Sequence, residues 1–217
     1  MCITKNIKQL KNKIPSTVTL VAVSKTKPVE DILEAYATDH YDFGENKVQE
    51  MIEKYNKLPK DINWHMIGHL QTNKVKYIAP FIDLIHSVDS LKLLKEINKR
   101  GLENKRTIKC LLQIQISKEV GKFGVSYKNA ISILQESKLL SNVNIIGLMG
   151  MATFTNNKNE IEIEFENLNY TYTRLQQDYT QIKILSMGMS QDYKIAIKQG
   201  SNMIRLGSTI FGKRKNK

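Results

Sequence analysis

Short apolar runs alternate with stretches of helical spacing along nearly the whole chain. Runs typical of buried strands lie near residues 18–23, 41–43, 64–67, 84–87, 108–116, 145–150, 182–187 and 203–206. Stretches with helical periodicity lie between them, near residues 29–37, 47–58, 72–78, 90–104, 127–137, 159–179 and 191–198. One further amphipathic stretch, residues 4–13, precedes the first strand and stands outside this alternation.

Strands that alternate with helices indicate a parallel sheet, because each helix returns the chain to the edge where the next strand begins. Eight such units in 217 residues are typical of a compact (β/α)8 barrel. We therefore predict an α/β protein, a single (β/α)8 TIM barrel domain over residues 1–217 with an extra N-terminal helix. An open, doubly wound sheet is the alternative. No GxGxxG follows the first strand, which counts against its dinucleotide-binding form.

The formal net charge of +12 raises the question of nucleic-acid binding. The lysines are interleaved with asparagine and glutamate along the whole chain, as on a solvated surface, and only the tail at 213–217 (KRKNK) is a basic run. A five-residue tail is usually a frayed end. A nucleic-acid partner is therefore not favoured, and a basic nucleic-acid-associated domain stays as a lesser alternative. The charge would also suit an anionic small ligand.

Membrane and secretory classes are not expected either. The apolar runs are too short to cross a bilayer, and the N-terminus MCITKNIKQLKNKI has no apolar core of a signal peptide. Cys2 and Cys110 have no metal-ligand or redox spacing. A reduced, cytoplasmic location is the simplest expectation.

The most informative position is Lys25, in the segment VAVSKTKP at 21–28. It lies where the first apolar strand ends, and the carboxyl ends of the strands carry the site in barrels of this type. A lysine with an apolar wall behind it and open space ahead is partly desolvated. Desolvation lowers the pKa of an amine, as an imine-forming lysine requires. The alternative is an ordinary solvated lysine at a strand end.

Two glycine- and serine-containing segments, SMGMS at 186–190 and RLGS at 205–208, follow or end the seventh and eighth strands. Glycines let backbone N–H groups approach an anion, and serine hydroxyls add donors. A helix is expected to begin just after the first segment, near residue 191, whereas the second leads into the final segment of the chain. Phosphate sites of such barrels often form from these two loops. Ser190 as a helix cap and Gly207 as a turn glycine are the alternatives.

Other polar residues also fall at expected strand ends. Arg205 lies between Ile204 and Leu206, so it must point into the barrel or its mouth and needs either a structural carboxylate or a ligand. His86 and Ser87 are expected to end the fourth strand. In WHMIGHLQTNK at 64–74, His65 and His69 are four residues apart. The segment has the pattern of a strand and a loop, without a third ligand, so we expect a buried, hydrogen-bonded His65 and no metal.

Taken together, eight motifs resemble the pyridoxal phosphate homeostasis proteins. The resemblance covers nearly the whole chain, in order. It implies a barrel like the N-terminal domain of alanine racemase, bound pyridoxal 5′-phosphate (PLP), and a role in vitamin B6 and amino-acid balance without established turnover. The motifs are VAVSKTKP, FGENKVQE, WHMIGHLQTNK, HSVDS, GKFG, GLMGMAT, SMGMSQDYKIAIKQGS and RLGSTIFGKR.

The resemblance also assigns roles. It implies that Lys25 forms the Schiff base with the cofactor aldehyde, that Arg205 faces the pyridine nitrogen, and that Asn46 lies near the hydroxyl side of the ring. Gln115 stands where the family often has an asparagine, so no contact is predicted there. The phosphate would be bound by the two loops, through Ser186, Gly188, Ser190, Gly207 and Ser208.

These roles favour a carrier over a catalyst. A guanidinium stays charged and only donates hydrogen bonds, so opposite the ring nitrogen it disfavours a protonated, strongly electron-withdrawing ring. Racemisation also needs a second acid or base, which alanine racemases take from a C-terminal domain. The sequence ends at Lys217, and we expect no such domain. We expect a monomer that holds PLP reversibly, with apo PLP-dependent enzymes and free amino acids as partners; a weak PLP-dependent amino-acid racemase is the alternative.

Overall fold

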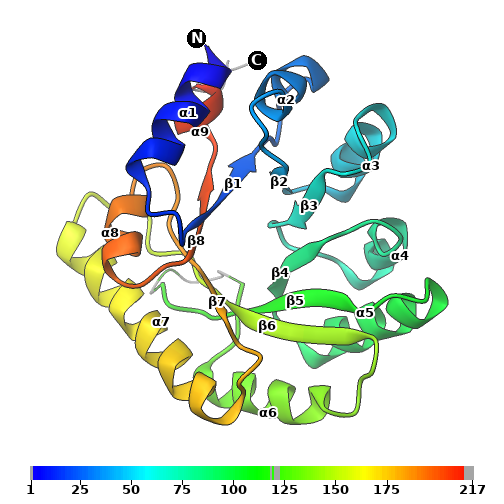
Figure 1. The fold of residues 1–217 in the computed structure, drawn as a ribbon. Coiled ribbons are helices and arrows are strands. Elements are labelled where there is room, and N and C mark those ends of the chain that lie inside the picture. The colour runs from blue at the N-terminus through cyan, green and yellow to red at the C-terminus, as the bar shows by residue number, and fades with distance from the viewer. Residues whose placement is uncertain (1, 118, 120–122, 213–217) are drawn as a thin grey trace.

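The computed structural model describes residues 2–117, 119 and 123–212. Their strands form one closed parallel barrel in the order β1-β2-β3-β4-β5-β6-β7-β8, and helices surround it (Figure 1). The predicted eight-stranded barrel is confirmed, and the open-sheet alternative is wrong. The strands are β1 (Thr19–Val23), β2 (Asp42–Glu45), β3 (Asn63–Met66), β4 (Leu84–Val88), β5 (Ile108–Gln113), β6 (Val143–Met149), β7 (Ile184–Ser186) and β8 (Met203–Leu206).

A helix precedes the barrel and helices follow its strands, as the sequence predicts. The extra N-terminal helix α1 packs beside α9 and α2 (Figure 1), and the amide of Asn6 donates to the carbonyl oxygen of Ile210 at 2.8 Å. The helices are α1 (Ile3–Lys13), α2 (Val29–Tyr36), α3 (Val48–Lys57), α4 (Val75–Ile78), α5 (Leu91–Glu103), α6 (Tyr127–Ser137), α7 (Lys158–Asp178), α8 (Tyr193–Lys198) and α9 (Ser208–Phe211), with a 3-10 turn η1 (Thr72–Lys74) before α4.

Helix α5 illustrates how local sequence sets an element. The Ser90 hydroxyl accepts the backbone N–H of Leu93 at 3.3 Å and so caps the first turn. Leu93, Leu94 and Ile97 recur at helical spacing and are all buried. Burying each such side chain stabilises the fold by roughly 2 kcal/mol.

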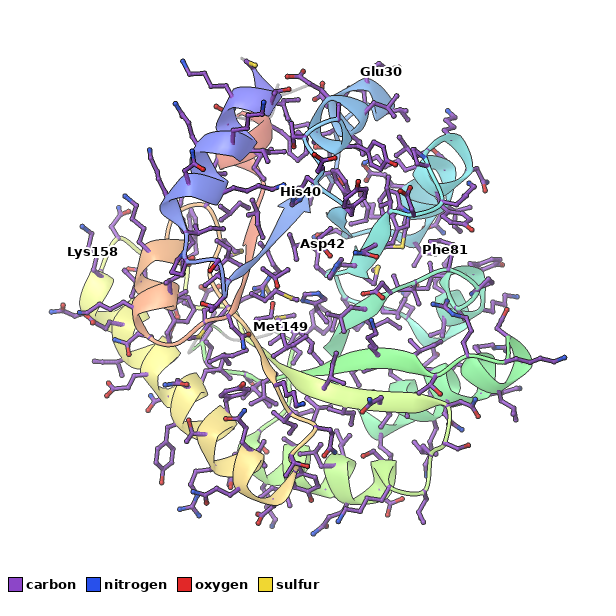
Figure 2. The ribbon with its side chains drawn as sticks, in the orientation of Figure 1. Glu30, His40, Asp42, Phe81, Met149 and Lys158 are labelled. Atoms are coloured by element: carbon purple, nitrogen blue, oxygen red, sulfur yellow. The ribbon has the colours of Figure 1, made fainter. Side chains whose placement is uncertain are left out.

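The inside of the barrel is partly apolar and partly polar. Alternate residues of each strand face inward, so Leu84 and His86 share the inner face of β4, and Met203 and Arg205 share that of β8. A small inner cluster includes Leu84, Met149 and Met203. In Figure 2, Met149 lies at the centre of the ring, whereas charged side chains such as Lys158 lie at its outer edge.

The boundaries of several strands differ from the prediction, and the differences at β4 and β5 change where predicted residues lie. Strand β4 continues through Val88, so His86 and Ser87 are buried inside it instead of ending it at the rim. Strand β5 ends at Gln113, because beyond it Ile114 forms only an isolated bridge with Val125. Sequence periodicity detects the apolar run but not the residue at which ladder pairing stops.

Two stretches that the sequence singles out lie wholly or partly outside the described residues: the GKFG motif, through residues 121 and 122, and the basic tail at 213–217. Within the described part of the chain, no helix combines the length and the apolar character needed to cross a bilayer.

Candidate functional site

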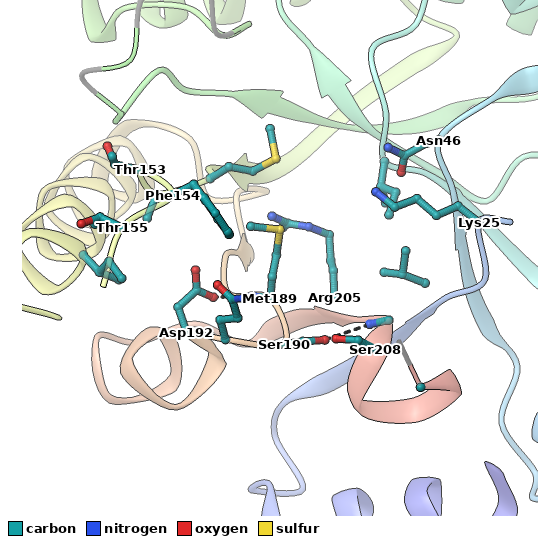
Figure 3. A pocket seen from close by; sticks show the side chains of 18 of the residues that line it. Lys25, Asn46, Thr153, Phe154, Thr155, Met189, Ser190, Asp192, Arg205 and Ser208 are labelled. Atoms are coloured by element: carbon teal, nitrogen blue, oxygen red, sulfur yellow. Dashed lines mark hydrogen bonds between the residues drawn. The ribbon is translucent and has the colours of Figure 1, made fainter. Parts of the chain in front are cut away.

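A cavity of about 380 Å³ lies at the carboxyl ends of the strands (Figure 3). Its volume is within the range of roughly 300–1,000 Å³ that is typical of small-molecule pockets. The lining comes mainly from the segments after β1, β2, β6, β7 and β8. It includes Val23, Lys25, Lys27, Asn46, Ile67, Met151, Thr153, Phe154, Met189, Ser190, Asp192, Arg205, Gly207 and Ser208.

Lys25 comes two residues after the end of β1 and reaches into the cavity beside Asn46 (Figure 3). The residues on both sides of it are held by carboxylates. Ser24 donates its hydroxyl to Glu45 Oε1 at 2.5 Å, and the backbone N–H of Thr26 donates to Glu50 Oε1 at 2.5 Å. Thr26 has a φ of 65°, a conformation that β-branched residues rarely adopt. The backbone that directs Lys25 is therefore constrained from both sides.

The two carboxylates are themselves joined by Lys54. Its Nζ donates to Glu45 Oε1 and Glu50 Oε1, both at 2.7 Å, and to the carbonyl oxygen of Ser24 at 2.8 Å. Burial raises the pKa of Glu45, and Lys54 and Ser24 oppose that rise. A buried charge persists when it is paired and hydrogen-bonded, as Lys54 is here.

Arg205 lines the cavity from β8 although it is only 4% exposed. Its Nη1 donates to the carbonyl oxygen and the hydroxyl of Ser186, at 2.9 and 2.6 Å, and its Nη2 donates to the carbonyl oxygen of Gly150 at 3.0 Å. Burial lowers the pKa of Arg205 to about 10, and the negative charge of Asp192 opposes this. The guanidinium is held by neutral oxygens and keeps its charge at neutral pH.

Ser190 joins the loops that follow β7 and β8. Its Oγ accepts the backbone N–H groups of Gly207 and Thr209, at 3.2 and 3.4 Å. A hydroxyl that accepts two N–H groups keeps its own hydrogen for donation. Ser190, Gly207 and Ser208 all line the cavity, so this hydrogen is available to an anionic ligand there.

The other two residues predicted for the phosphate loops, Ser186 and Gly188, are not part of the cavity lining. Ser186 ends β7 and is fully buried behind Arg205. Gly188 has a φ of 97°, and a Cβ there would lie 2.6 Å from the Cβ of Ala196, so the turn requires glycine. Its carbonyl oxygen accepts the backbone N–H of Arg205 at 3.0 Å. Both residues support the loop from behind.

The structure adds cavity residues that sequence reasoning missed. Lys27 shares the first motif with Lys25, and its Nζ donates to the carbonyl oxygen of Phe211 at 2.9 Å. Phe154, 80% exposed, follows the GLMGMAT motif. Asp192 accepts the N–H of Met189 at 2.5 Å, and burial raises the pKa of its carboxyl against that hydrogen bond. Lys27 and Asp192 lie within motifs that the sequence analysis quotes, and this membership is the signal that could have found them; Phe154 lies just outside one.

One of the residues that line the cavity, Asn46, has a buried acceptor atom without a hydrogen-bond partner in the part of the chain that the structure describes. The Asn46 Oδ1 atom is buried and has no hydrogen-bond partner within the described residues, although buried acceptors are normally satisfied. A ligand hydroxyl or amine beside Lys25 would satisfy it. With a lysine amine, a buried guanidinium and the Ser190 hydroxyl, the cavity offers cationic and hydrogen-bond-donor groups that suit an anionic ligand. No group of three His, Cys, Asp or Glu residues in the described ranges could hold a metal ion.

Comparison with known proteins agrees with this geometry. The family model described as the alanine racemase N-terminal domain matches residues 2–215. A pyridoxal phosphate homeostasis protein of Aquifex aeolicus is 38% identical over 198 residues, 90% of this chain and 87% of the relative. One from Schizosaccharomyces pombe is 36% identical over 200 residues, 91% and 84% of the two chains. The chain belongs to the pyridoxal phosphate homeostasis protein family. The resemblance stated from its motifs is confirmed.

The chain is also similar to several solved structures. PipY of Synechococcus elongatus, solved without PLP, is 36% identical with a TM-score of 0.92, covering 97% of this chain and all of PipY. PipY with PLP bound gives a TM-score of 0.89. Alanine racemase of Clostridium difficile is 15% identical with a TM-score of 0.85, covering 99% of this chain and 57% of the racemase. At that identity the likeness extends to the fold alone.

Proposed function

We propose that this protein binds PLP through a reversible Schiff base on Lys25 and takes part in the intracellular balance of vitamin B6 and amino acids. The observation that carries the proposal is the position of Lys25, which reaches into the cavity beside the buried, unpaired Oδ1 of Asn46. The PLP-bound structure of PipY, a relative at 36% identity, supports the choice of ligand.

Each residue then has a defined task. When bound, the cofactor supplies an aldehyde that condenses with amines and a ring that withdraws electrons from them. Lys25 provides the amine, and Asn46 accepts a hydrogen bond on the hydroxyl side of the ring. Arg205 donates to the ring nitrogen and so disfavours its protonation. Ser190, Gly207 and Ser208 bind the phosphate, with Ser186 and Gly188 shaping the loops behind them.

We further propose that residues 1–217 act as one cytoplasmic, monomeric PLP-binding domain. Amines that compete with Lys25 release the cofactor, so free amino acids and apo PLP-dependent enzymes are the natural recipients. Because Arg205 leaves the ring nitrogen unprotonated, the bound ring is a weak electron sink. This favours holding and transfer of the cofactor over turnover.

An absorbance spectrum tests the proposal. Wild-type protein mixed with PLP should show the long-wavelength band of a protonated imine, and Lys25→Ala should abolish it because the condensing amine is gone. Lys27→Ala is the matched control, since Lys27 lines the same cavity, and it should keep the band. Equal bands in wild type and Lys25→Ala would contradict the proposal.

Racemisation is the alternative activity, favoured by the barrel shared with alanine racemase. Incubation of the loaded protein with L-amino acids in deuterated water separates the two. A carrier should leave the α-hydrogen unexchanged over many hours. Deuterium at the α-carbon together with D-amino acid would establish an enzyme instead.

A further inference from the structure

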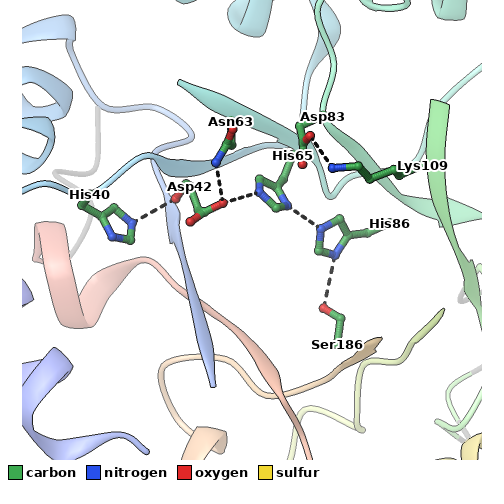
Figure 4. Close-up of polar contacts among 8 residues, drawn as sticks. All are labelled: His40, Asp42, Asn63, His65, Asp83, His86, Lys109 and Ser186. Atoms are coloured by element: carbon green, nitrogen blue, oxygen red, sulfur yellow. Dashed lines mark hydrogen bonds and ion pairs between the residues drawn. The ribbon is translucent and has the colours of Figure 1, made fainter. Parts of the chain in front are cut away.

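A chain of hydrogen bonds runs through the barrel interior from Asp42 at the amino end of β2 to Ser186 at the end of β7 (Figure 4). Arg205 extends it to the cavity. Asp42 Oδ1 and His65 Nε2 are 3.1 Å apart, and His65 Nδ1 and His86 Nε2 are 2.9 Å apart. His86 Nδ1 lies 3.2 Å from Ser186 Oγ, which accepts from Arg205 Nη1 at 2.6 Å. Five strands thus contribute one residue each, and the last residue lines the cavity.

The middle of this chain is sealed from solvent. His65 is 2% exposed, and His86 and Ser186 are fully buried, whereas the Asp42 side chain is 30% exposed. Buried donors and acceptors that lack partners are costly. Each ring nitrogen of the two histidines and the Ser186 hydroxyl must therefore be paired within this chain of hydrogen bonds.

The two ends set the direction of donation. A guanidinium has donors only, so Ser186 Oγ must accept from Arg205 and can donate its own hydrogen onward. An ionised carboxylate has acceptors only. Burial opposes ionisation of Asp42, but hydrogen bonds from His65 and Asn63 outweigh it and lower its pKa. His65 must then carry a hydrogen on Nε2.

The donors of Arg205 at one end and the acceptors of Asp42 at the other decide which ring nitrogens of the two histidines carry hydrogen. Burial, with the nearby His65 and Arg205, lowers the pKa of His86 far below its usual value, so this ring is neutral and has one N–H. If His86 donates from Nε2 to His65 Nδ1, its Nδ1 accepts the Ser186 hydroxyl and every group is satisfied. In the reversed arrangement Ser186 Oγ would receive two donors, and its own hydrogen would have no acceptor in the chain.

We propose that Asp42, His65, His86 and Ser186 are positioning residues for Arg205, joined in a one-way chain in which every hydrogen bond points from the guanidinium toward the Asp42 carboxylate. Aligned bonds in a low-dielectric interior polarise one another. The chain therefore brings the influence of a negative charge to a buried cation whose direct partners are neutral oxygens, and it holds the guanidinium in one orientation.

The consequence at the cofactor rests on the proposed function, because Arg205 matters there as the residue at the ring nitrogen. The chain itself is a property of the protein without PLP. An ordinary satisfied polar core would also contain these contacts, but it would not connect Asp42 to the tautomer of His86 or to ligand binding at the other end of the barrel.

Nitrogen-15 NMR of the histidine rings in PLP-free protein is the first test, with signals assigned by single substitutions of the four histidines. At neutral pH both His65 and His86 should carry hydrogen on Nε2 and an unprotonated Nδ1. A hydrogen on Nδ1 of His86 would overturn the proposal. This measurement needs no substitution of Asp42, so it decides the matter even if such a variant fails to fold.

Asp42→Ala provides the second test, with Asp83→Ala as its matched control. Asp83 lies at the same end of the barrel, is exposed to a similar extent, and pairs with Lys109 at 2.9 Å outside the chain (Figure 4). Asp42→Ala should shift part of the His86 population to the tautomer with hydrogen on Nδ1. It should also raise the Kd for PLP roughly fivefold, a change comparable to the net contribution of one hydrogen bond.

Asp83→Ala should change neither readout. Identical tautomers and affinities in the two variants would overturn the chain as a positioning device. If wild-type protein failed to bind PLP while its tautomers were as stated, the proposed function would fall and the one-way chain would stand.

Discussion

At the scale of single residues, burial lowers the pKa of two histidines of the barrel, His40 and His86. His40 is 4% exposed, and its Nε2 donates to the carbonyl oxygen of Asp42 at 3.0 Å. Burial lowers the pKa of His40 to about 4, with Lys11 adding to the shift and Asp42 opposing it. In an unfolded chain the same ring titrates near 6.5, so the unfolded protein binds a proton that the folded protein excludes.

Stability should therefore fall as the pH is lowered from 6.5 toward 4. Over that window His40 alone should remove about 3 kcal/mol from the free energy of unfolding, and His86 acts in the same direction. Urea denaturation of wild type and His40→Gln at several pH values checks this. The wild-type curve should descend more steeply, and parallel curves would contradict the assigned neutral ring.

The place of a single residue could be predicted where the residue lies in or next to an apolar run that forms a strand. Lys25 and Arg205 each adjoin such a run, and both line the cavity. Ser186 was expected to contact the phosphate, but it belongs to β7 and faces His86 and Arg205. The sequence does not show where a strand ends, and that residue decides whether a side chain faces the barrel core or the cavity.

Neighbouring elements hold the Lys25 segment in place. Glu50 and Lys54 are one turn apart on α3 and pair at 2.7 Å, and both contact the segment that follows β1. The type of each element could be predicted from periodicity, and the bounds of α6 agree with the expected 127–137. That α3 orients the Lys25 segment could not be predicted from periodicity, because this role depends on contacts between segments some 25 residues apart in the sequence.

Loss of the Glu50 charge should loosen this segment. Glu50→Gln weakens the acceptor for the Thr26 N–H and should cost about 1 kcal/mol of stability, with weaker PLP binding because Lys25 is less well oriented. Glu53→Gln, an exposed change on the same helix, should leave both quantities unchanged. Denaturant titration and the Kd for PLP measure them, and equal behaviour of the two variants would argue against a role for α3 in orienting Lys25.

At the scale of the whole molecule, the barrel holds the cavity at one end and the chain of hydrogen bonds in the interior below it. The cavity occupies the carboxyl ends of the strands, and the polar chain runs beneath it to Asp42 at the amino end of β2. Alternation of strands and helices predicted the barrel, and its rim could be inferred from the same pattern. The chain of hydrogen bonds could not be inferred from the sequence, because it depends on how five strands without a common sequence motif are rotated relative to one another.

The central claim is that one lysine at this rim condenses with the cofactor. Borohydride reduction of the protein mixed with PLP, followed by protease digestion and mass analysis of the peptides, tests it most directly. The account predicts one reduced pyridoxyl adduct, on Lys25. A stable adduct on Lys27 or on any other side chain instead, or no adduct at all, would contradict it.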